Sequence, residues 1–183
     1  MSLIALDRSI LIFFNRSFRC EFLDFLSILF ADPRPFIPII ILILLYLFYR
    51  GGRNLRINIL WLFLLILLND QVSCHLLKPV FGRIRPCHSI VLSTPLGCSK
   101  SYSFPSGHAT NIMALAVFVM LNNRKWGPGF LFLALVVSLS RLYLGVHYPS
   151  DILGGWLVGA GLAVLVNALK NKIGFASRSK KSG

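Results

Sequence analysis

The sequence predicts an all-α fold, a polytopic membrane helix bundle of five to six transmembrane helices with an amphipathic N-terminal segment. Hydrophobic residues make up 56% of the 183 residues and charged residues only 14%, against roughly 25% charged in an ordinary globular domain. The mean hydropathy of +0.73 leaves too little polar surface to cover a water-soluble fold. The same composition excludes a disordered chain and a disulfide-dense secreted scaffold.

Five apolar stretches are the predicted spans, because about 20 apolar residues cross the hydrocarbon core as a helix. The first is short and follows the turn-forming residues 32–35, DPRP. The second holds one charged residue, Asp70, and the fourth holds only Arg141. The third and fifth hold no Asp, Glu, Lys or Arg. The five ranges are 36–49, 57–77, 101–123, 126–150 and 152–169.

The first 31 residues contain two shorter apolar stretches that charged residues interrupt. We interpret residues 1–18 as an amphipathic helix at the membrane interface. Residues 20–32 are either a short sixth span or a re-entrant segment. The whole chain, 1–183, is expected to form a single membrane-embedded domain.

Basic residues predict the orientation, since Lys and Arg collect on the cytoplasmic side of a membrane protein. The chain holds 19 Lys and Arg against 6 Asp and Glu, a net charge of +13. Many of the basic residues lie in three segments that fall on one face if the five spans alternate. We therefore place that face on the cytoplasmic side. For a membrane protein of this composition, the expected partners are membrane lipids and no nucleic acid. The three groups are Arg50, Arg53 and Arg56; Arg124 and Lys125; and Lys170, Lys172, Arg178, Lys180 and Lys181.

The chemistry is predicted on the opposite face, where polar groups cost free energy unless they are paired or functional. Three stretches lie at the outer ends of spans: KPVFGRIRP at 78–86, PSGH at 105–108 and SRLYLGVHYPSD at 140–151. Their cations Lys78, Arg85 and Arg141 suit a group with two negative charges, because Arg matches a phosphate edge and Lys supplies a point charge.

The PSGH stretch adds a helix N-terminus to these cations. Ser106 is a good N-cap, and Gly107 lets the backbone approach a ligand closely. The free N–H groups of the first helical turn, together with the helix dipole, make a ready anion site.

Two histidines and a carboxylate complete the predicted site. Asp151 follows His147 by four residues and would hold one ring nitrogen, leaving the other free to attack phosphorus. His108, at the start of the facing helix, would protonate the departing oxygen. This set needs no metal and no cofactor.

The three stretches resemble the signature of the type 2 phosphatidic acid phosphatase superfamily, which includes lipid phosphatases and vanadium haloperoxidases. The family pattern is Lys, six residues, Arg-Pro; then Pro-Ser-Gly-His; then Ser-Arg, five residues, His, three residues, Asp. The chain matches it in order and without a gap over residues 78–151. The matching residues are Lys78, Arg85, Pro86, Pro105, Ser106, Gly107, His108, Ser140, Arg141, His147 and Asp151.

The resemblance implies a lipid phosphatase that forms a phosphohistidine at His147, with Asp151 in support and His108 as general acid. Lys78, Arg85, Ser106, Gly107 and Arg141 would hold the phosphate. The expected setting is a bacterial inner membrane with the site facing the periplasm. A short chain with a basic outer loop is most similar to the lipid A 1-phosphatases. Undecaprenyl pyrophosphate and phosphatidylglycerophosphate are the alternative substrates.

Rival functions remain at this point. A phospholipid-binding or lipid transport protein would need the cations but not the His147–Asp151 pair. A soluble vanadate-dependent peroxidase conflicts with the spans. A metal-dependent phosphatase lacks carboxylates, since only Asp32 and Asp151 are clearly outward among the six acidic residues.

Several residues outside the signature have plainer interpretations. Asp70 and His75 are expected to make structural hydrogen bonds, and Cys74 to be a small buried apolar side chain. Arg83 and His88 are either structural or headgroup contacts. Cys87 and Cys98 share the outer loop, where an oxidising periplasm would allow a disulfide. The small residues of 154–161, GGWLVGAG, predict close helix packing.

Overall fold

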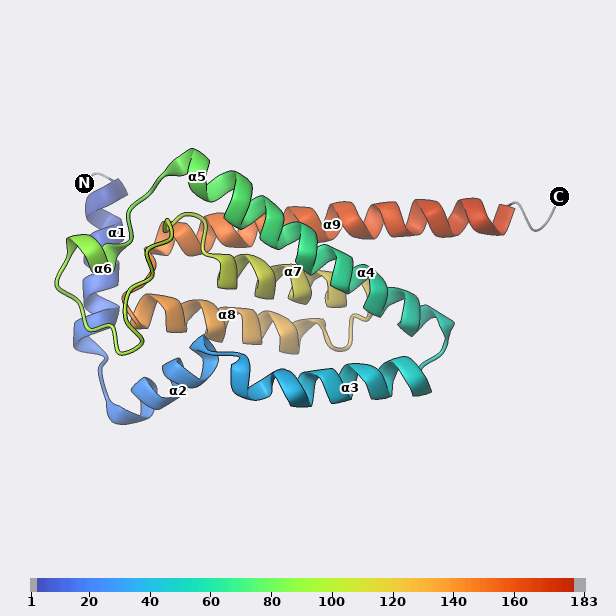
Figure 1. Cartoon of the computed structure of the whole chain (residues 1–183), viewed down its shortest axis with the longest axis horizontal. Helices are drawn as coiled ribbons and strands as arrows, with labels where there is room; N and C mark the ends of the chain where they lie inside the picture. Colours follow the sequence, from blue (N-terminus) through green and yellow to red (C-terminus); the bar gives the residue numbers. More distant parts are fainter. Residues whose placement is uncertain (1–2, 180–183) are drawn as a thin grey trace.

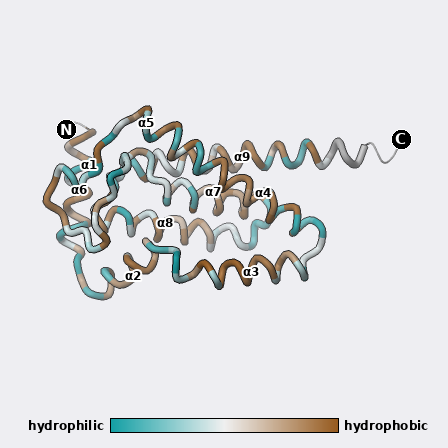
Figure 2. The backbone as a smooth tube through the Cα atoms, viewed as in Figure 1, coloured by the Kyte–Doolittle hydropathy of each residue, from teal (hydrophilic) through white to brown (hydrophobic). Residues whose placement is uncertain are grey.

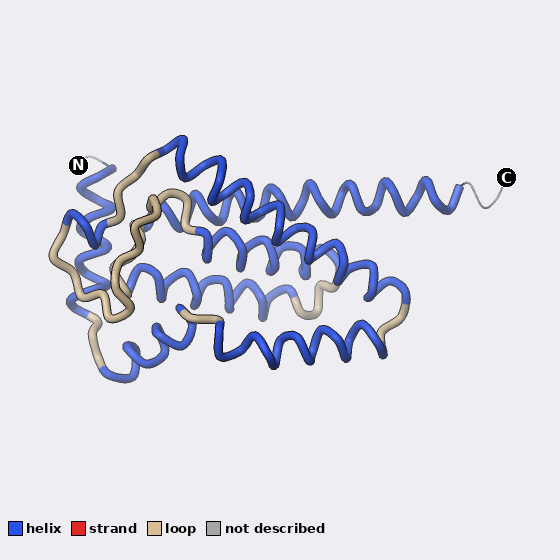
Figure 3. The backbone as a smooth tube through the Cα atoms, in the orientation of Figure 1, coloured by secondary structure: helices blue, strands red, loops and turns tan. Residues whose placement is uncertain are grey.

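The computed structural model describes residues 3–179, with side chains as far as Gly174, and in that range every regular element is helical (Figures 1 and 3). The long helices are α3 (Ile37–Arg50), α4 (Arg53–Asp70), α7 (Gly107–Asn122), α8 (Gly127–Tyr143) and α9 (Pro149–Ser179). They correspond one to one with the five predicted spans. The all-α bundle is therefore confirmed.

Helix lengths differ from those expected. Residues Arg53–Ser89 and Pro149–Gly174 are each long and apolar enough to cross a membrane alone, whereas α7 and α8 are shorter apolar helices. The third predicted span begins later than expected, at Gly107, because the preceding residues form the loop that carries PSGH. The long element from Arg53 runs through a π-helical stretch, η3 (Gln71–Leu77), into the short helices α5 (Lys78–Phe81) and α6 (Pro86–Ser89).

The N-terminal region contains three further elements, α1 (Leu3–Ile12), the π-helical η1 (Phe13–Ser17) and α2 (Glu21–Ala31). Helix α1 lies across the end of the bundle (Figure 1). It leaves Leu3 and Ile4 largely exposed, as expected of an interfacial helix. Helix α2 continues through η2 (Arg34–Phe36) into α3, and the two together are long and apolar enough for one crossing. They are bent by 63° at the predicted DPRP turn.

Helix α7 lies at the centre and packs most extensively against α9 and α8. The predicted small-residue face of α9 makes this possible. A Cβ atom at Gly159 would lie 2.2 Å from the Thr110 carbonyl oxygen, and one at Gly155 would lie 2.9 Å from the Ser106 carbonyl oxygen. The main core cluster joins α4, α7 and α9 through Leu65, Ala114, Val117, Phe118, Ala163 and Val166.

The two ends of the bundle differ in composition, as predicted. Figure 1 shows the α3–α4 connection, the α7–α8 connection and the extended part of α9 at one end. These segments carry the basic groups named above, of which Lys180 and Lys181 lie outside the described residues. The signature loops gather at the other end (Figure 3). Between the ends, α3 and α4 consist mostly of hydrophobic residues (Figure 2), and many of their large hydrophobic side chains are exposed. This is the composition expected of a surface that faces lipid.

Candidate active site

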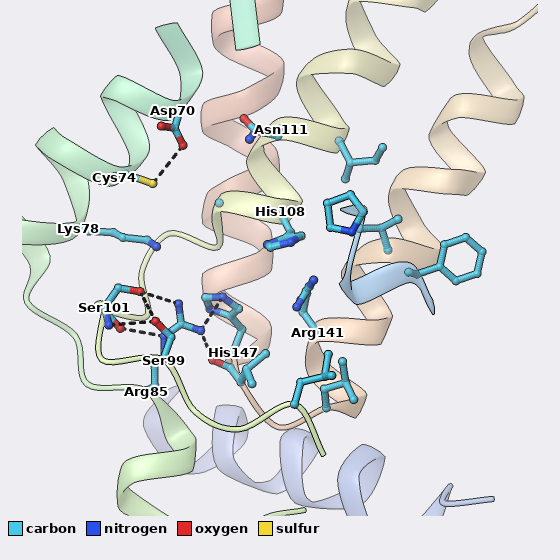
Figure 4. A pocket seen from close by; sticks show the side chains of 18 of the residues that line it. Asp70, Cys74, Lys78, Arg85, Ser99, Ser101, His108, Asn111, Arg141 and His147 are labelled. Carbon is cyan, nitrogen blue, oxygen red and sulfur yellow. Dashed lines mark hydrogen bonds between the residues drawn. The ribbon is translucent and has the colours of Figure 1, made fainter. Parts of the chain in front are cut away.

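The signature residues surround one cavity of about 670 Å³ at the loop-rich end of the bundle (Figure 4). Helix ends and loops that are far apart in sequence meet here: η3 and α5, the N-terminus of α7, the C-terminus of α8 and the turn before α9. Six of the eight predicted site residues line it, namely Lys78, Arg85, Gly107, His108, Arg141 and His147. The other two, Ser106 and Asp151, lie behind this lining, with fully buried side chains.

Arg85 is held by oxygens of a serine-bearing loop and of Val146, and it also contacts the signature residue His147. Its Nε donates to the Ser101 carbonyl oxygen at 2.8 Å, and its Nη2 donates to Ser101 Oγ at 2.9 Å. Its Nη1 donates to the Val146 carbonyl oxygen at 3.2 Å. These three bonds to neutral oxygens orient the guanidinium of Arg85, a residue that is only 8% exposed, without neutralising its charge. Sequence reasoning missed Ser101, because no local pattern shows where this loop folds back.

Arg141 enters from the last turn of α8 and is likewise held by a neutral partner. One Nη atom donates a short hydrogen bond to the carbonyl oxygen of Ala31 at the end of α2. Its Nε is buried and has no hydrogen-bond partner among residues 3–174. The other acidic residue in a predicted span, Asp70, forms no ion pair with Arg141 among the described residues, and its carboxylate accepts from Cys74 Sγ at 3.4 Å. The Arg141 charge is thus available to an anion in the cavity.

His147 is presented to the cavity by the turn between α8 and α9 and is only 2% exposed. Its Nε2 lies 3.3 Å from Nη1 of Arg85, and its Nδ1 lies 3.5 Å from Oδ2 of Asp151. Because a guanidinium only donates, Nε2 offers its lone pair and Nδ1 carries the proton. Burial, and secondarily the charges of Arg85 and Arg141, lower the His147 pKa to about 4, although Asp151 opposes the shift. The imidazole is therefore neutral at neutral pH.

Asp151 is fully buried behind His147 and is held by several donors. Its Oδ2 accepts from the Tyr148 backbone N–H at 2.8 Å and accepts a short hydrogen bond from Ser103 Oγ. The same Ser103 oxygen lies 3.4 Å from His147 Nδ1, so it bridges the carboxylate and the imidazole. Ser103 is a second residue that the motifs did not reveal.

Arg83 makes a further contact with this carboxylate. Its Nη1 lies 2.7 Å from Oδ1 of Asp151, and its Nη2 lies 2.7 Å from Oδ2 of Asp7 on α1. Asp7 is 5% exposed and also accepts from the backbone N–H of Ser150 at 3.0 Å. Arg83 therefore has a structural role at this end of the molecule. Asp7 lies at the same end as Asp151, although the sequence predicts only Asp32 and Asp151 to be clearly outward.

The N-terminus of α7 forms the opposite wall. His108 is exposed to the cavity, and a Cβ atom at Gly107 would meet only Cys74 Sγ, at 4.0 Å. The absent side chain therefore leaves space for a ligand. Ser106 is the N-cap of α7, but its hydroxyl makes no capping bond and has no hydrogen-bond partner among residues 3–174. It does not reach the lining, so the structure does not bring it into the predicted phosphate site.

The residues outside the signature differ in outcome. His75 is exposed on η3 and its side chain makes no hydrogen bond with any other described residue, so its expected structural hydrogen bond is not formed. Cys87 and Cys98 form a disulfide. His88 is exposed, and its Nε2 lies 3.1 Å from the Ser99 carbonyl oxygen, outside the cavity lining. In the described part of the chain, no three His, Cys, Asp or Glu side chains gather in a way that could hold a metal ion.

The arrangement combines three cations, a helix N-terminus and a neutral, oriented imidazole around one space. It can bind a doubly charged anion and present a nucleophilic nitrogen to it. The family model described as the PAP2 superfamily matches residues 59–175, more than half of the chain. The chain belongs to the PAP2 superfamily.

PAP2 relatives act on different lipids. The chain is 33% identical over 123 residues to an undecaprenyl-diphosphatase of Sulfolobus acidocaldarius, covering 66% of this chain and 58% of that protein. It is 30% identical over 163 residues to a lipid A 4'-phosphatase of Bacteroides thetaiotaomicron, covering 84% and 72%. The match thus spans less than two thirds of the first relative.

A solved PAP2 structure shares the fold. A crystal structure of a transmembrane PAP2 type phosphatidylglycerolphosphate phosphatase from Bacillus subtilis aligns with a TM-score of 0.67 and 27% identity. The alignment covers 93% of this chain and 87% of that one. Membership of the PAP2 superfamily and the fold of a transmembrane PAP2 phosphatase are therefore shown, whereas the relatives act on several different lipids.

Proposed function

We propose that the protein removes phosphate from a membrane lipid headgroup through a covalent phosphohistidine at His147, without a metal ion. The observation that carries the proposal is the orientation of His147, with Nε2 beside Arg85 in the cationic cavity and Nδ1 toward Asp151. The non-enzymatic alternative, a lipid-binding or transport protein, gives no reason for a buried carboxylate that orients this imidazole.

The reaction follows from that orientation in two steps. Nε2 of His147 attacks phosphorus while the bond to the lipid oxygen breaks, and His108 gives its proton to that oxygen. A water molecule then attacks the phosphohistidine, passes its proton to His108 and releases inorganic phosphate, which restores both histidines. Lys78, Arg85 and Arg141, with the backbone N–H groups at Gly107, stabilise the charge on the phosphoryl oxygens in both steps. Ser106 would contact the phosphate only after its side chain rotates toward the cavity.

The best candidate substrate is the 1-phosphate of lipid A, and undecaprenyl pyrophosphate and phosphatidylglycerophosphate are the alternatives. The cavity lies at the end of apolar helices, so acyl chains can stay in the bilayer while the phosphate reaches the cations. We place this end at the periplasmic face of the inner membrane. Two observations support the placement: the basic segments lie at the other end, and a disulfide is typical of an oxidising compartment.

The test is phosphate release in detergent with EDTA, using the purified protein and His147→Ala. The substrates are lipid A, undecaprenyl pyrophosphate, phosphatidylglycerophosphate and phosphatidic acid. We expect release by the wild type alone, and the order of kcat/KM identifies the lipid. No release from any of the four by folded protein would overturn the enzymatic function, and loss of release in EDTA would overturn the metal-free reaction.

A further inference from the structure

The cavity extends beyond the phosphate site into a second polar zone. Besides the signature residues, its lining includes Asp70, Cys74 and Asn111. Figure 4 shows these three on the far side of Lys78 and His108 from His147. Cys74, expected to be a buried apolar side chain, is only half-buried. Asp70 makes the expected hydrogen bond, with Cys74, and is exposed.

Helix geometry places this zone along one path from the phosphate site. Asp70, Cys74 and Lys78 follow one another at intervals of four residues where α4 passes through η3 into α5, and all three line the cavity. Asn111 lies one turn after His108 on α7. The amide of Asn69 donates to Oδ1 of Asn111 at 2.6 Å, which orients Asn111 and leaves its own amide N–H groups as donors.

The proposed reaction places the departing alcohol in this zone. His147 attacks from one side of the phosphorus atom, so the leaving oxygen lies on the opposite side, toward His108. The rest of the leaving group then extends past His108, between Asp70 and Asn111. A carboxylate within an apolar span costs free energy unless it has a functional or charged partner. The zone therefore suits a group that donates hydrogen bonds to Asp70 and accepts them from Asn111.

We propose that Asp70 and Asn111 form a leaving-group subsite for a neutral, hydroxyl-bearing moiety such as a sugar. Hydroxyl groups of the sugar donate to the Asp70 carboxylate and accept from the Asn111 amide. A diphosphate substrate would instead place its second phosphate beside the Asp70 carboxylate, where like charges repel. Resting on the proposed function, this subsite favours glycosyl phosphate lipids, the class that includes lipid A, over polyprenyl diphosphates.

The simpler explanation is that Asp70 balances the charge of Lys78, which lies eight residues later on the same helical face. The two explanations differ in how they affect different substrates. Loss of charge balance would alter the handling of the two phosphate monoesters, lipid A and phosphatidic acid, by a similar factor. Loss of a leaving-group subsite would alter substrates according to what they carry beyond the phosphate.

The experiment measures kcat/KM in detergent for lipid A, undecaprenyl pyrophosphate and phosphatidic acid, whose diacylglycerol leaving group has neither a sugar nor a second phosphate. The variants are Asp70→Asn and Asn111→Leu. The control is Glu21→Gln, which removes a carboxylate outside the cavity lining. Each kcat/KM value is divided by the value for phosphatidic acid with the same variant, so that losses of activity common to all substrates cancel.

We expect Asp70→Asn to lower the lipid A ratio roughly tenfold, since a hydrogen bond to a charged group is lost. The undecaprenyl pyrophosphate ratio should rise, because the repulsion is removed. Asn111→Leu should lower the lipid A ratio only, and Glu21→Gln should leave both ratios as in the wild type. Unchanged ratios in both cavity variants would overturn the subsite. Absence of phosphate release by the wild type would instead overturn the proposed function.

Discussion

Arg83 lies 2.7 Å from Asp151 and connects the carboxylate behind His147 to the N-terminal helix. The same guanidinium lies 2.7 Å from Asp7 on α1 and stacks over the Tyr148 ring at 4.1 Å from its centroid. One cation therefore joins three elements that are far apart in sequence. Arg83 contacts Oδ1 of Asp151, so Oδ2 of the same carboxylate accepts from Ser103 and faces His147.

Replacing Arg83 should therefore impair catalysis although it does not line the cavity. Arg83→Gln leaves two buried carboxylates without their cation, and we expect kcat to fall roughly ten- to hundredfold. Asp7→Asn should have a smaller effect in the same direction. The measurement is kcat and KM for the preferred lipid, together with the melting temperature in detergent. Arg8→Gln, on the exposed side of α1, is the matched control; a wild-type kcat in folded Arg83→Gln would contradict the positioning role.

Gly107 offers a sharp test of the phosphate site, because the space beside its Cα belongs to the cavity. Gly107→Ala should fold normally, since the added Cβ meets only Cys74 Sγ at 4.0 Å. It should raise KM by obstructing the approach of the phosphate to the α7 backbone. Gly129→Ala is the control, since a Cβ there meets no atom within 4 Å. Equal kinetics for the two variants would show that the phosphate does not approach Gly107.

The low His147 pKa predicts how activity depends on pH. Burial lowers this pKa to about 4, so the nucleophile stays neutral and active above that pH and is lost by protonation as the pH falls through it. The acid limb of kcat/KM should therefore lie well below the ordinary histidine pKa of about 6.5.

The substrate also titrates, with a second phosphate pKa of about 6, so its ionisation is measured separately by phosphorus NMR and divided out. Asp151→Asn should move the limb to still lower pH, because Asp151 raises the His147 pKa. A corrected limb near pH 6.5 in the wild type would show that His147 is not the group whose neutral form is required.

The disulfide should act through Arg85. Cys87 follows Arg85 by two residues, and Cys98 lies just before Ser101, which holds the Arg85 guanidinium. Reduction, or the double variant Cys87→Ser and Cys98→Ser, frees this loop, so KM should rise more than kcat falls. Cys20→Ser is the control, since Cys20 is a free, exposed thiol. Identical KM values with and without reductant would show that the disulfide does not affect phosphate binding.

Much of the site could be predicted because its residues follow helix geometry. The distance of four residues between His147 and Asp151 fits one helical turn, and alternation of the spans brings Lys78, His108 and Arg141 to one end. Asp7 and Ser103 could not be found in this way. They reach Arg83 and Asp151 through the docking of α1 and the path of a loop, and neither leaves a periodic pattern in the sequence.

Two residues show where a motif alone is insufficient. Ser106 matches the signature, yet the close approach of Gly155 on α9 packs this end of α7 tightly, and its hydroxyl is buried away from the lining. Asp70 lies outside every motif and makes the hydrogen bond expected of it, with Cys74, yet it also lines the cavity at the point where α4 passes into η3. Side-chain direction at a helix irregularity depends on the tertiary packing.

The central claim is the covalent bond between His147 and phosphorus, and rapid quenching with phosphorus-32 substrate tests it most directly. The wild type, quenched in alkali within the first turnover, should carry label that is stable to base and lost in acid, as a phosphoramidate is. Peptide mapping should place that label on His147, and folded His147→Ala should carry none. Turnover by the wild type without bound label at any quench time, or label that persists in His147→Ala, would contradict the account.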